Sequence, residues 1–197
     1  MLDEYKTVAR SAVVKAVINR SEFIAHVQEV DSEKEAKSFI ADVKEKHKQA
    51  THNCSAYSIG LGTKEIIFSD DNGEPSGTGG KPILGAIKSS GLTNCVVVVT
   101  RYFGGKKLGV RGLIDAYGGV AKDAIDQAGI VTKIISEPIA FNCSYADFNN
   151  VQYYLHKYDA QIIDSDYGAD IKLKIKIRAS LAQELAGILE QFGTIIK

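Results

Sequence analysis

Cysteine is scarce in this sequence of 197 residues, and the spacing of its three cysteines excludes two common kinds of site. Cys54, Cys95 and Cys143 are odd in number and far apart, and no CxxC pair is present. A disulfide framework or a zinc ribbon needs cysteines in pairs, so neither is supported. Reduced thiols are typical of the cytosol, and we therefore expect a cytoplasmic protein without a bound metal or cofactor.

Long apolar segments are also absent. The first ten residues include Asp3, Glu4, Lys6 and Arg10, and they lack the apolar core of a signal peptide. Elsewhere no apolar run approaches the roughly 20 residues that cross a bilayer. We therefore expect neither a secretion signal nor a membrane partner.

A net charge is absent too, because 24 Lys and Arg residues balance 24 Asp and Glu residues. This balance excludes a simple polycationic nucleic-acid binder. One local imbalance remains, since no acidic residue lies between Glu74 and Asp115. The basic residues in that window are Lys81, Lys88, Arg101, Lys106, Lys107 and Arg111. The window predicts an electropositive surface, with chance clustering on a solvated face as the alternative.

The hydrophobic pattern predicts a first domain of mixed strands and helices. Two paired strands are expected within residues 5–30, followed by a helix whose first turn is capped by Ser32 and Glu35. The continuous β-branched run Cys95–Val99 indicates a central strand covered on both faces. A long amphipathic helix comes after the next glycine-rich segment and ends at Gly129.

The rest of the chain predicts a second domain with the element order β-α-β-β-α-β, which is the ferredoxin-like order. Within it, a basic strand carrying Lys172 and Lys174 is expected to pair with a strand carrying Asp164 and Asp166, which would neutralise it. We therefore predict an α+β protein of two domains, residues 1–135 and residues 136–197.

Two glycine-rich segments are candidate binding sites. The first, Asp71 to Lys81, contains four glycines whose amide groups offer an anion nest. It is not a Walker A loop, because Pro82 follows its lysine where Ser or Thr is required. A mobile surface loop is the plainer interpretation. The candidate binding residues here are Glu74, Ser76, Thr78 and Lys81.

The second segment runs from Arg101 to Gly112 and follows the carboxyl end of the central strand, where ligands gather in sheets covered by helices. Its glycines permit close approach of a backbone, and its cations suit phosphate. Tyr102 and Phe103 are placed to stack on bases, and we expect only one of them to be exposed. The candidate binding residues here are Arg101, Tyr102, Gly104, Gly105, Lys106, Lys107, Gly109 and Arg111.

Small residues recur along the helix that follows. Gly109, Gly112, Ala116 and Gly119 share one side of it. Because an interior glycine costs a helix roughly 1 kcal/mol, the pair at positions 118 and 119 needs a reason. Tight packing against a neighbouring helix is the favoured one, and a smooth docking face for a nucleic acid or protein partner is the alternative.

Catalysis has one candidate. On a strand, His52 and Cys54 point to the same side, and Asp70, Asp71 or Glu74 would supply an orienting acid. No nucleophile elbow and no zinc-deaminase motif accompanies them. A buried cysteine is usually a small hydrophobe. A hydrolase or transferase using this pair is therefore the alternative to a binding protein.

Three motifs together carry a resemblance to a known family. They are Ala50-x-His52-Asn53-Cys54, the run from Asp71 to Thr78, and Arg101-Tyr102-Phe103-Gly104-Gly105-x-x-Leu108-Gly109. In this order and at these separations the chain resembles the IMPACT/YigZ family, with residues 15–128 similar to its N-terminal domain and the tail similar to its bacterial C-terminal domain.

The resemblance implies an N-terminal domain like ribosomal protein S5 domain 2 and a C-terminal domain like domain V of elongation factor G. Eukaryotic members restrain a starvation-kinase pathway through an additional RWD domain, which we expect this bacterial-type chain to lack. The expected partners are therefore RNA, the ribosome or a protein of the translation apparatus. The hypothesis is a non-catalytic RNA- or ribosome-associated protein that modulates translation, with a protein-interaction module as a further alternative.

Overall fold

The computed structural model describes residues 3–196 and divides into two compact units. One is Lys6–Thr132, and the other joins the N-terminal residues up to Tyr5 to the segment that begins at Lys133. The chain passes between them within β1 (Glu4–Val8) and β7 (Ile130–Ile134), which pair as a two-stranded sheet. The predicted two-domain α+β class is confirmed. No helix in the described range is long and apolar enough to cross a membrane.

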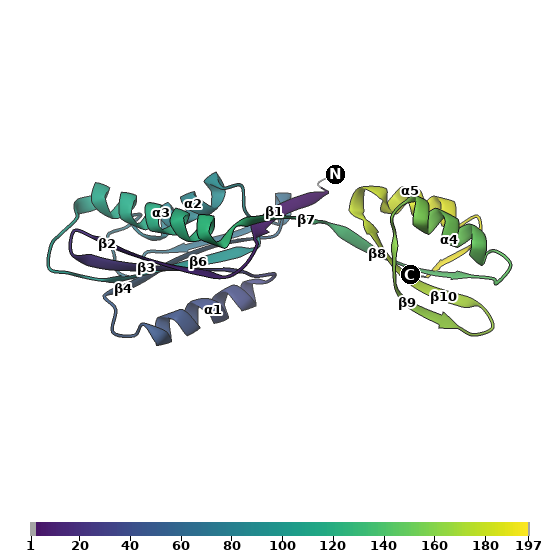
Figure 1. Cartoon of the computed structure of the whole chain (residues 1–197), viewed down its shortest axis with the longest axis horizontal. Helices are drawn as coiled ribbons and strands as arrows, with labels where there is room; N and C mark the ends of the chain where they lie inside the picture. Colours follow the sequence, from purple (N-terminus) through teal and green to yellow (C-terminus); the bar gives the residue numbers. More distant parts are fainter. Residues whose placement is uncertain (1–2, 197) are drawn as a thin grey trace. The chain divides into compact units, whose positions relative to one another are not determined.

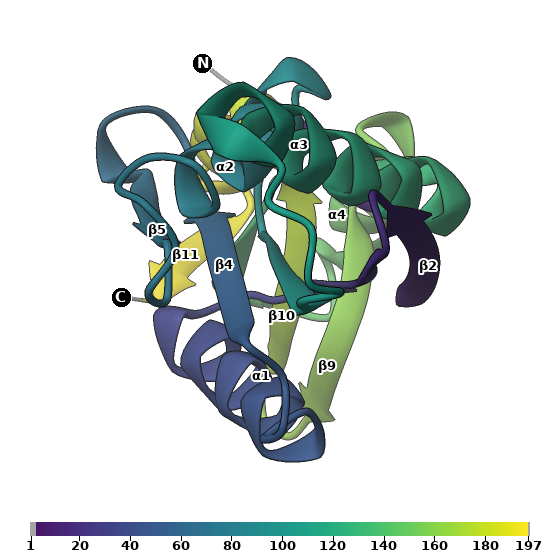
Figure 2. The same cartoon turned by 90° about the vertical axis from the view of Figure 1, so that its left-hand side faces the viewer.

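The larger unit is a five-stranded sheet between two layers of helix. The strand order is β2-β3-β6-β4-β5, and every neighbouring pair is antiparallel. Helix α1 (Glu33–Lys46) covers one face, while α2 (Gly80–Ser89) and α3 (Gly109–Ala128) cover the other (Figures 1 and 2). The strands are β2 (Ala12–Ile18), β3 (Ser21–Glu29), β4 (His52–Ile59), β5 (Ile66–Asp70) and β6 (Cys95–Tyr102).

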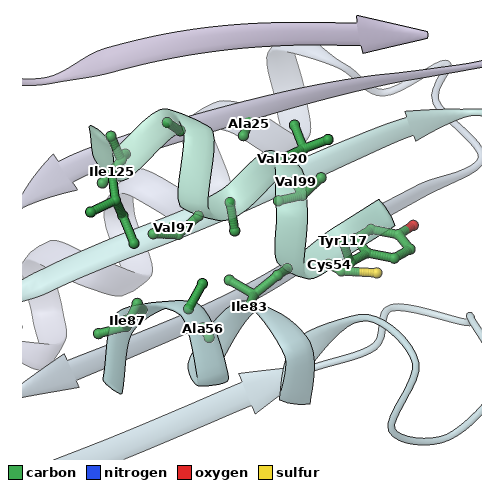
Figure 3. Close-up of a cluster of buried hydrophobic side chains, with 14 of the residues drawn as sticks. Ala25, Cys54, Ala56, Ile83, Ile87, Val97, Val99, Tyr117, Val120 and Ile125 are labelled. Carbon is green, nitrogen blue, oxygen red and sulfur yellow. The ribbon is translucent and has the colours of Figure 1, made fainter. Parts of the chain in front are cut away.

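Strand β6 lies at the centre of this sheet, as its valine run predicts. Because side chains alternate along a strand, Val97 and Val99 pack under α2 and α3, whereas Val96 and Val98 pack against α1. All four are fully buried. Figure 3 shows Val97 and Val99 within the apolar cluster on the α2–α3 side. The alternation continues into Arg101, which therefore extends toward the same side.

Local sequence signals set the ends of these elements. The backbone amide of Glu35 donates to Ser32 Oγ, and the Glu35 carboxylate accepts from the amide of Asp31, so the predicted cap of α1 is confirmed. The hairpin between β2 and β3 turns at Asn19 and Arg20, whose φ angles are 47° and 68°. Two left-handed residues in a row suit the twist of a tight hairpin.

The smaller unit confirms the predicted ferredoxin-like order. Its antiparallel sheet has the order β11-β8-β10-β9. In the register of that sheet Lys172 pairs with Asp166 and Lys174 with Asp164, so the predicted position of these acids opposite the basic strand is confirmed. The elements are β8 (Ser136–Cys143), α4 (Phe148–Lys157), β9 (Gln161–Tyr167), β10 (Ile171–Arg178), α5 (Ala179–Leu189) and β11 (Gly193–Ile196).

The glycine pair of α3 has two different environments. A Cβ on Gly118 would lie 3.6 Å from the Pro82 Cβ of α2, which is an ordinary van der Waals distance, so an alanine would fit there. A Cβ on Gly119 would meet nothing within 4 Å. Helix packing therefore requires a glycine at neither position, and the expected tight packing does not explain the pair. The small-residue side is not one continuous surface either, because Ala116 is buried while Gly119 is exposed.

Replacing Gly119 with alanine is expected to raise the free energy of unfolding by about 0.5–1 kcal/mol, because alanine favours the helix and has room there. Gly109→Ala in the same helix provides the opposite case. Its φ of 73° is a left-handed conformation, so that change should lower stability by about 1–2 kcal/mol. Urea unfolding followed by circular dichroism measures both, and a loss of stability in Gly119→Ala would contradict the open environment.

Candidate functional site

Three neighbouring strands place a row of side chains at one end of the larger sheet. Arg101 on β6 pairs with Phe23 on β3 and with His52 on β4. The alternation that directs Val97 and Val99 toward α2 and α3 directs Arg101 the same way. The row therefore lies beneath the start of α3, beside the loop that carries Glu74.

Glu74 is the centre of a buried polar cluster. Its Oε1 accepts hydrogen bonds from Arg101 Nη1 at 2.6 Å and from the Tyr117 hydroxyl at 2.8 Å. His52 Nε2 lies 3.9 Å from the same oxygen. The side chains of Arg101 and Glu74 are only 6% and 3% exposed. A charge pair this deeply buried is stable only while both partners are present.

The Arg101 guanidinium is held on several sides. Its Nη2 donates to Ser21 Oγ at 3.3 Å. Its central carbon lies 5.5 Å from the ring centroid of Phe23 and 5.2 Å from that of Phe103. These contacts correct the expectation that Arg101 offers a free surface cation to phosphate, because its charge is already paired with Glu74.

The first glycine-rich segment does form an anion nest, and Asp71 fills it. The carboxylate of Asp71 accepts from the amides of Gly77, Gly79 and Gly80 at 2.7, 2.9 and 2.8 Å. Burial opposes ionisation of Asp71, but these backbone bonds outweigh it and hold the pKa of the carboxyl below its usual range. The three amides are therefore not free for an external phosphate.

The other candidates of that segment separate into buried and exposed groups. Thr78 is buried and its hydroxyl donates to the Pro75 carbonyl at 2.7 Å, which corrects its expected role as a ligand group. Ser76 and Lys81 are exposed. Neither of them lines the pocket described below.

His52 and Cys54 do not form a thiolate–imidazole pair. Cys54 Sγ donates to the Asp71 carbonyl at 3.0 Å, and His52 Nδ1 donates to the Asn72 carbonyl at 2.9 Å. Within residues 3–196 no hydrogen bond joins the two side chains. Burial raises the pKa of the Cys54 thiol to about 12. Figure 3 shows Cys54 beside Tyr117 in the apolar cluster, so the thiol behaves as a small core residue.

Cys54 should accordingly resist alkylation in the folded chain at pH 7–8, because almost none of a thiol with a pKa of about 12 is ionised there. Iodoacetamide labelling followed by peptide mass spectrometry, in buffer and in urea, measures this. Labelling is expected only after unfolding. Rapid labelling of the native chain, with a rate that rises near pH 7, would restore Cys54 as a nucleophile.

A pocket of about 430 Å³ opens above the buried cluster. Two of its apolar side chains are open to solvent, since Phe103 is 45% and Val110 61% exposed. Lys107 lies on its rim, and the adjacent Lys106 is exposed. The pocket is lined by Thr51, His52, Glu74, Pro75, Arg101, Phe103, Lys107, Leu108, Gly109, Val110 and Leu113.

The two aromatic residues after Arg101 point in different directions. The Tyr102 hydroxyl is hydrogen-bonded to His47 Nδ1 at 3.0 Å, at the end of α1 on the other face of the sheet. Phe103 lies at the pocket. The prediction that only one of them is exposed is confirmed. The exposed one is Phe103, so Tyr102 is not placed to stack on a base in this pocket.

Comparison with known proteins identifies the family. A model described as the Impact N-terminal domain matches residues 19–125, and a domain of unknown function, DUF1949, matches residues 141–192. IMPACT family member YigZ of Escherichia coli is 34% identical over 94% of this chain and 91% of its own length. The chain belongs to the IMPACT family. Member YvyE of Bacillus subtilis is 37% identical over 88% of this chain and 80% of its own length.

One solved structure of a relative supports the architecture. The crystal structure of a hypothetical protein covers 97% of this chain and 93% of its own, with 31% identity and a TM-score of 0.70. A structure of the two-domain translational regulator Yih1 covers 63% of this chain and 47% of its own, with 26% identity and a TM-score of 0.38. The first match supports the whole two-domain fold, and the second is too distant to carry an argument.

In this IMPACT family chain the three sequence motifs meet at one place. The first motif contributes His52, the second contributes Glu74 and the third contributes Arg101. The motifs that identify the family therefore mark a buried polar cluster and the pocket above it. Of the other sequence candidates, Lys107 and Gly109 line the pocket, whereas Arg111 pairs with Asp115 at 3.0 Å outside it.

Sequence reasoning missed several residues of this site. The sequence pattern indicates that Tyr117 is one more apolar residue of the helix stripe, although its hydroxyl donates a hydrogen bond to Glu74. Ser21 belongs to a hairpin turn far away in the chain, and it contacts Arg101 across the sheet. In the sequence Asp71 is a candidate orienting acid, whereas its carboxylate fills the nest. No local pattern distinguishes these residues, because their partners are 6 to 80 positions away.

Proposed function

We propose that this chain is a non-catalytic RNA-binding protein of the cytoplasm that acts at the ribosome or on the translation apparatus. It binds through the exposed part of the Arg101–Arg111 segment, with Lys106 and Lys107 contacting phosphates. The observation that carries the proposal is the combination of these two exposed lysines with an exposed aromatic ring, Phe103, at the mouth of an apolar pocket. Cations for the backbone and an aromatic surface for bases are what RNA recognition uses.

Pairing with Arg101 removes the negative charge of Glu74 from this surface. Arg101 neutralises the one acid of the pocket, and the sequence has no further acid before Asp115. Neither Lys106 nor Lys107 has a salt-bridge partner among residues 3–196, whereas Arg111 is paired with Asp115. Lys106 and Lys107 are therefore available for phosphate, which suits weak, sequence-tolerant binding.

The link to translation rests on analogy. The family resemblance implies an N-terminal domain like that of ribosomal protein S5 and a C-terminal domain like one of elongation factor G. The ribosome is therefore one proposed partner beside free RNA. The raised pKa of Cys54, and the hydrogen bonds of Cys54 and His52 to two different backbone carbonyls, give no support to the alternative of a thiol hydrolase or transferase.

The salt dependence of RNA affinity tests this proposal. The affinity of the wild-type chain for a fluorescent 20-nucleotide single-stranded RNA, measured by anisotropy, should fall as the salt concentration rises. Lys106→Ala/Lys107→Ala should bind more weakly at low salt. Its plot of log affinity against log salt should be shallower by about 1.4, because each single-strand phosphate contact contributes roughly 0.7.

Lys34→Ala/Lys46→Ala is the matched control, since it removes two exposed lysines from α1 on the opposite face of the sheet. The control should bind like the wild type. Equal losses in both double variants would point to general electrostatic attraction. The complete absence of binding at low salt would overturn the proposed function.

A further inference from the structure

The pocket combines apolar walls with a polar floor. The start of α3 and the residue before it provide Leu108, Val110 and Leu113. Phe103 comes from the loop that precedes α3. Arg101 covers one face of the Phe103 ring at 5.2 Å. The ring is nevertheless 45% exposed. Exposed apolar groups rimmed by lysines mark a site of interaction rather than part of the core.

The floor presents hydrogen-bond acceptors. Glu74 Oε1 already takes the bonds from Arg101 and Tyr117, whereas Oε2 takes none from residues 3–196. His52 donates from Nδ1 to the Asn72 carbonyl, so in the uncharged ring its other nitrogen, Nε2, carries the lone pair. Nε2 has no hydrogen-bond partner in the described part of the chain and lies 3.9 Å from the Glu74 carboxylate. A ligand that reaches this floor must therefore bring N–H donors.

We propose that the pocket receives one unpaired base of a single-stranded RNA, with an exocyclic amino group directed toward Glu74 and His52; this inference rests on the proposed function. The apolar walls suit the faces of the base, and Lys106 and Lys107 suit its flanking phosphates. Adenine N6 and cytosine N4 are exocyclic amino groups, whereas guanine and uracil present a carbonyl oxygen at the corresponding position. A uracil would set an acceptor against the acceptors of the floor.

A double helix cannot use this pocket. Bases in a duplex are stacked on both faces, and their amino edges are paired with the other strand. Entry would require a base to leave the stack, which costs a few kcal/mol. The inferred specificity is therefore for single strands over duplexes, and for adenine and cytosine over uracil.

Anisotropy with the full chain tests this with three probes of 12 nucleotides at one salt concentration: oligo-A, oligo-U and a duplex of mixed sequence. Oligo-A should bind more tightly than oligo-U and the duplex. Phe103→Ala should weaken oligo-A binding about 5- to 150-fold, the range for loss of one stacking contact. Phe103→Tyr keeps the ring and should restore the affinity, which excludes misfolding of the alanine variant as the cause.

Phe68→Ala is the matched control, because Phe68 is the exposed phenylalanine of β5, is 38% exposed and does not line the pocket. It should bind oligo-A like the wild type. If the chain binds RNA but prefers neither single strands nor oligo-A, or if Phe103→Ala binds normally, the base pocket is overturned while RNA binding stands. If no probe binds at low salt, both the proposed function and the base pocket are overturned.

Discussion

Glu74→Ala is expected to lower the free energy of unfolding by about 3–5 kcal/mol, the usual cost of removing one partner from a buried ion pair. The variant would leave the Arg101 guanidinium uncompensated in a site where its side chain is only 6% exposed. It would also remove the acceptor of the Tyr117 hydroxyl. Urea unfolding at pH 7 followed by circular dichroism measures the loss.

A double-mutant cycle measures the coupling free energy between Glu74 and Arg101 separately from their contacts with other residues. Arg101→Met removes the cation and keeps much of the apolar volume, so the double variant with Glu74→Ala should lose less stability than the sum of the two single variants. Glu74→Gln retains an oxygen that accepts hydrogen bonds and should lie between wild type and alanine. Additive losses would show that the two charges do not depend on each other.

Asp71→Ala is expected to cost about 2–4 kcal/mol, because the amides of Gly77, Gly79 and Gly80 would lose a charged acceptor in a partly buried loop. The same carboxylate lies at the start of α2, where negative charge is favourable. Loss of the nest should loosen the loop that carries Glu74. Asp42→Ala, which removes an exposed aspartate from α1, is the control and should change stability by less than about 0.5 kcal/mol.

The pH dependence of this effect has a definite sign. The pKa of Asp71 is lower in the folded chain than in the unfolded chain, because backbone hydrogen bonds outweigh the opposing effect of burial. Its contribution is therefore present above the unfolded pKa, near 3.8, and is lost as the pH falls through the folded pKa. The stability difference between wild type and Asp71→Ala should be constant from pH 5 to 7 and shrink below pH 4. A difference that grows on acidification would contradict the nest.

Much of the fold follows from short-range patterns in the sequence. The run Cys95–Val99 predicts a strand covered on both faces, and the alternating lysines of β10 predict a sheet with one wet face. Both are confirmed because burial and strand period act on neighbouring residues. The two-stranded sheet of β1 and β7 escaped prediction, since its strands are separated by more than a hundred residues and neither has a strong pattern.

The site was less predictable than the fold. The charge of Arg101 and the glycines of the first loop both suggest free phosphate ligands, and each is already used inside the protein, by Glu74 and by Asp71. A sequence shows which groups can bind an anion. It does not show whether an acid elsewhere in the chain already pairs with them in the folded protein. Phe103, Lys106 and Lys107 remain open at the pocket or beside it, and they carry the proposed function.

The position at which RNA attaches tests that function most directly. Single-stranded oligo-A containing photoreactive 8-azidoadenosine, cross-linked to the full chain by ultraviolet light and mapped by peptide mass spectrometry, reports the residues in contact. We predict cross-links to Phe103 and its neighbours in the Arg101–Arg111 segment, reduced in Lys106→Ala/Lys107→Ala. Cross-links confined to residues 136–197, or unchanged in that variant, would contradict the assignment of RNA binding to this pocket.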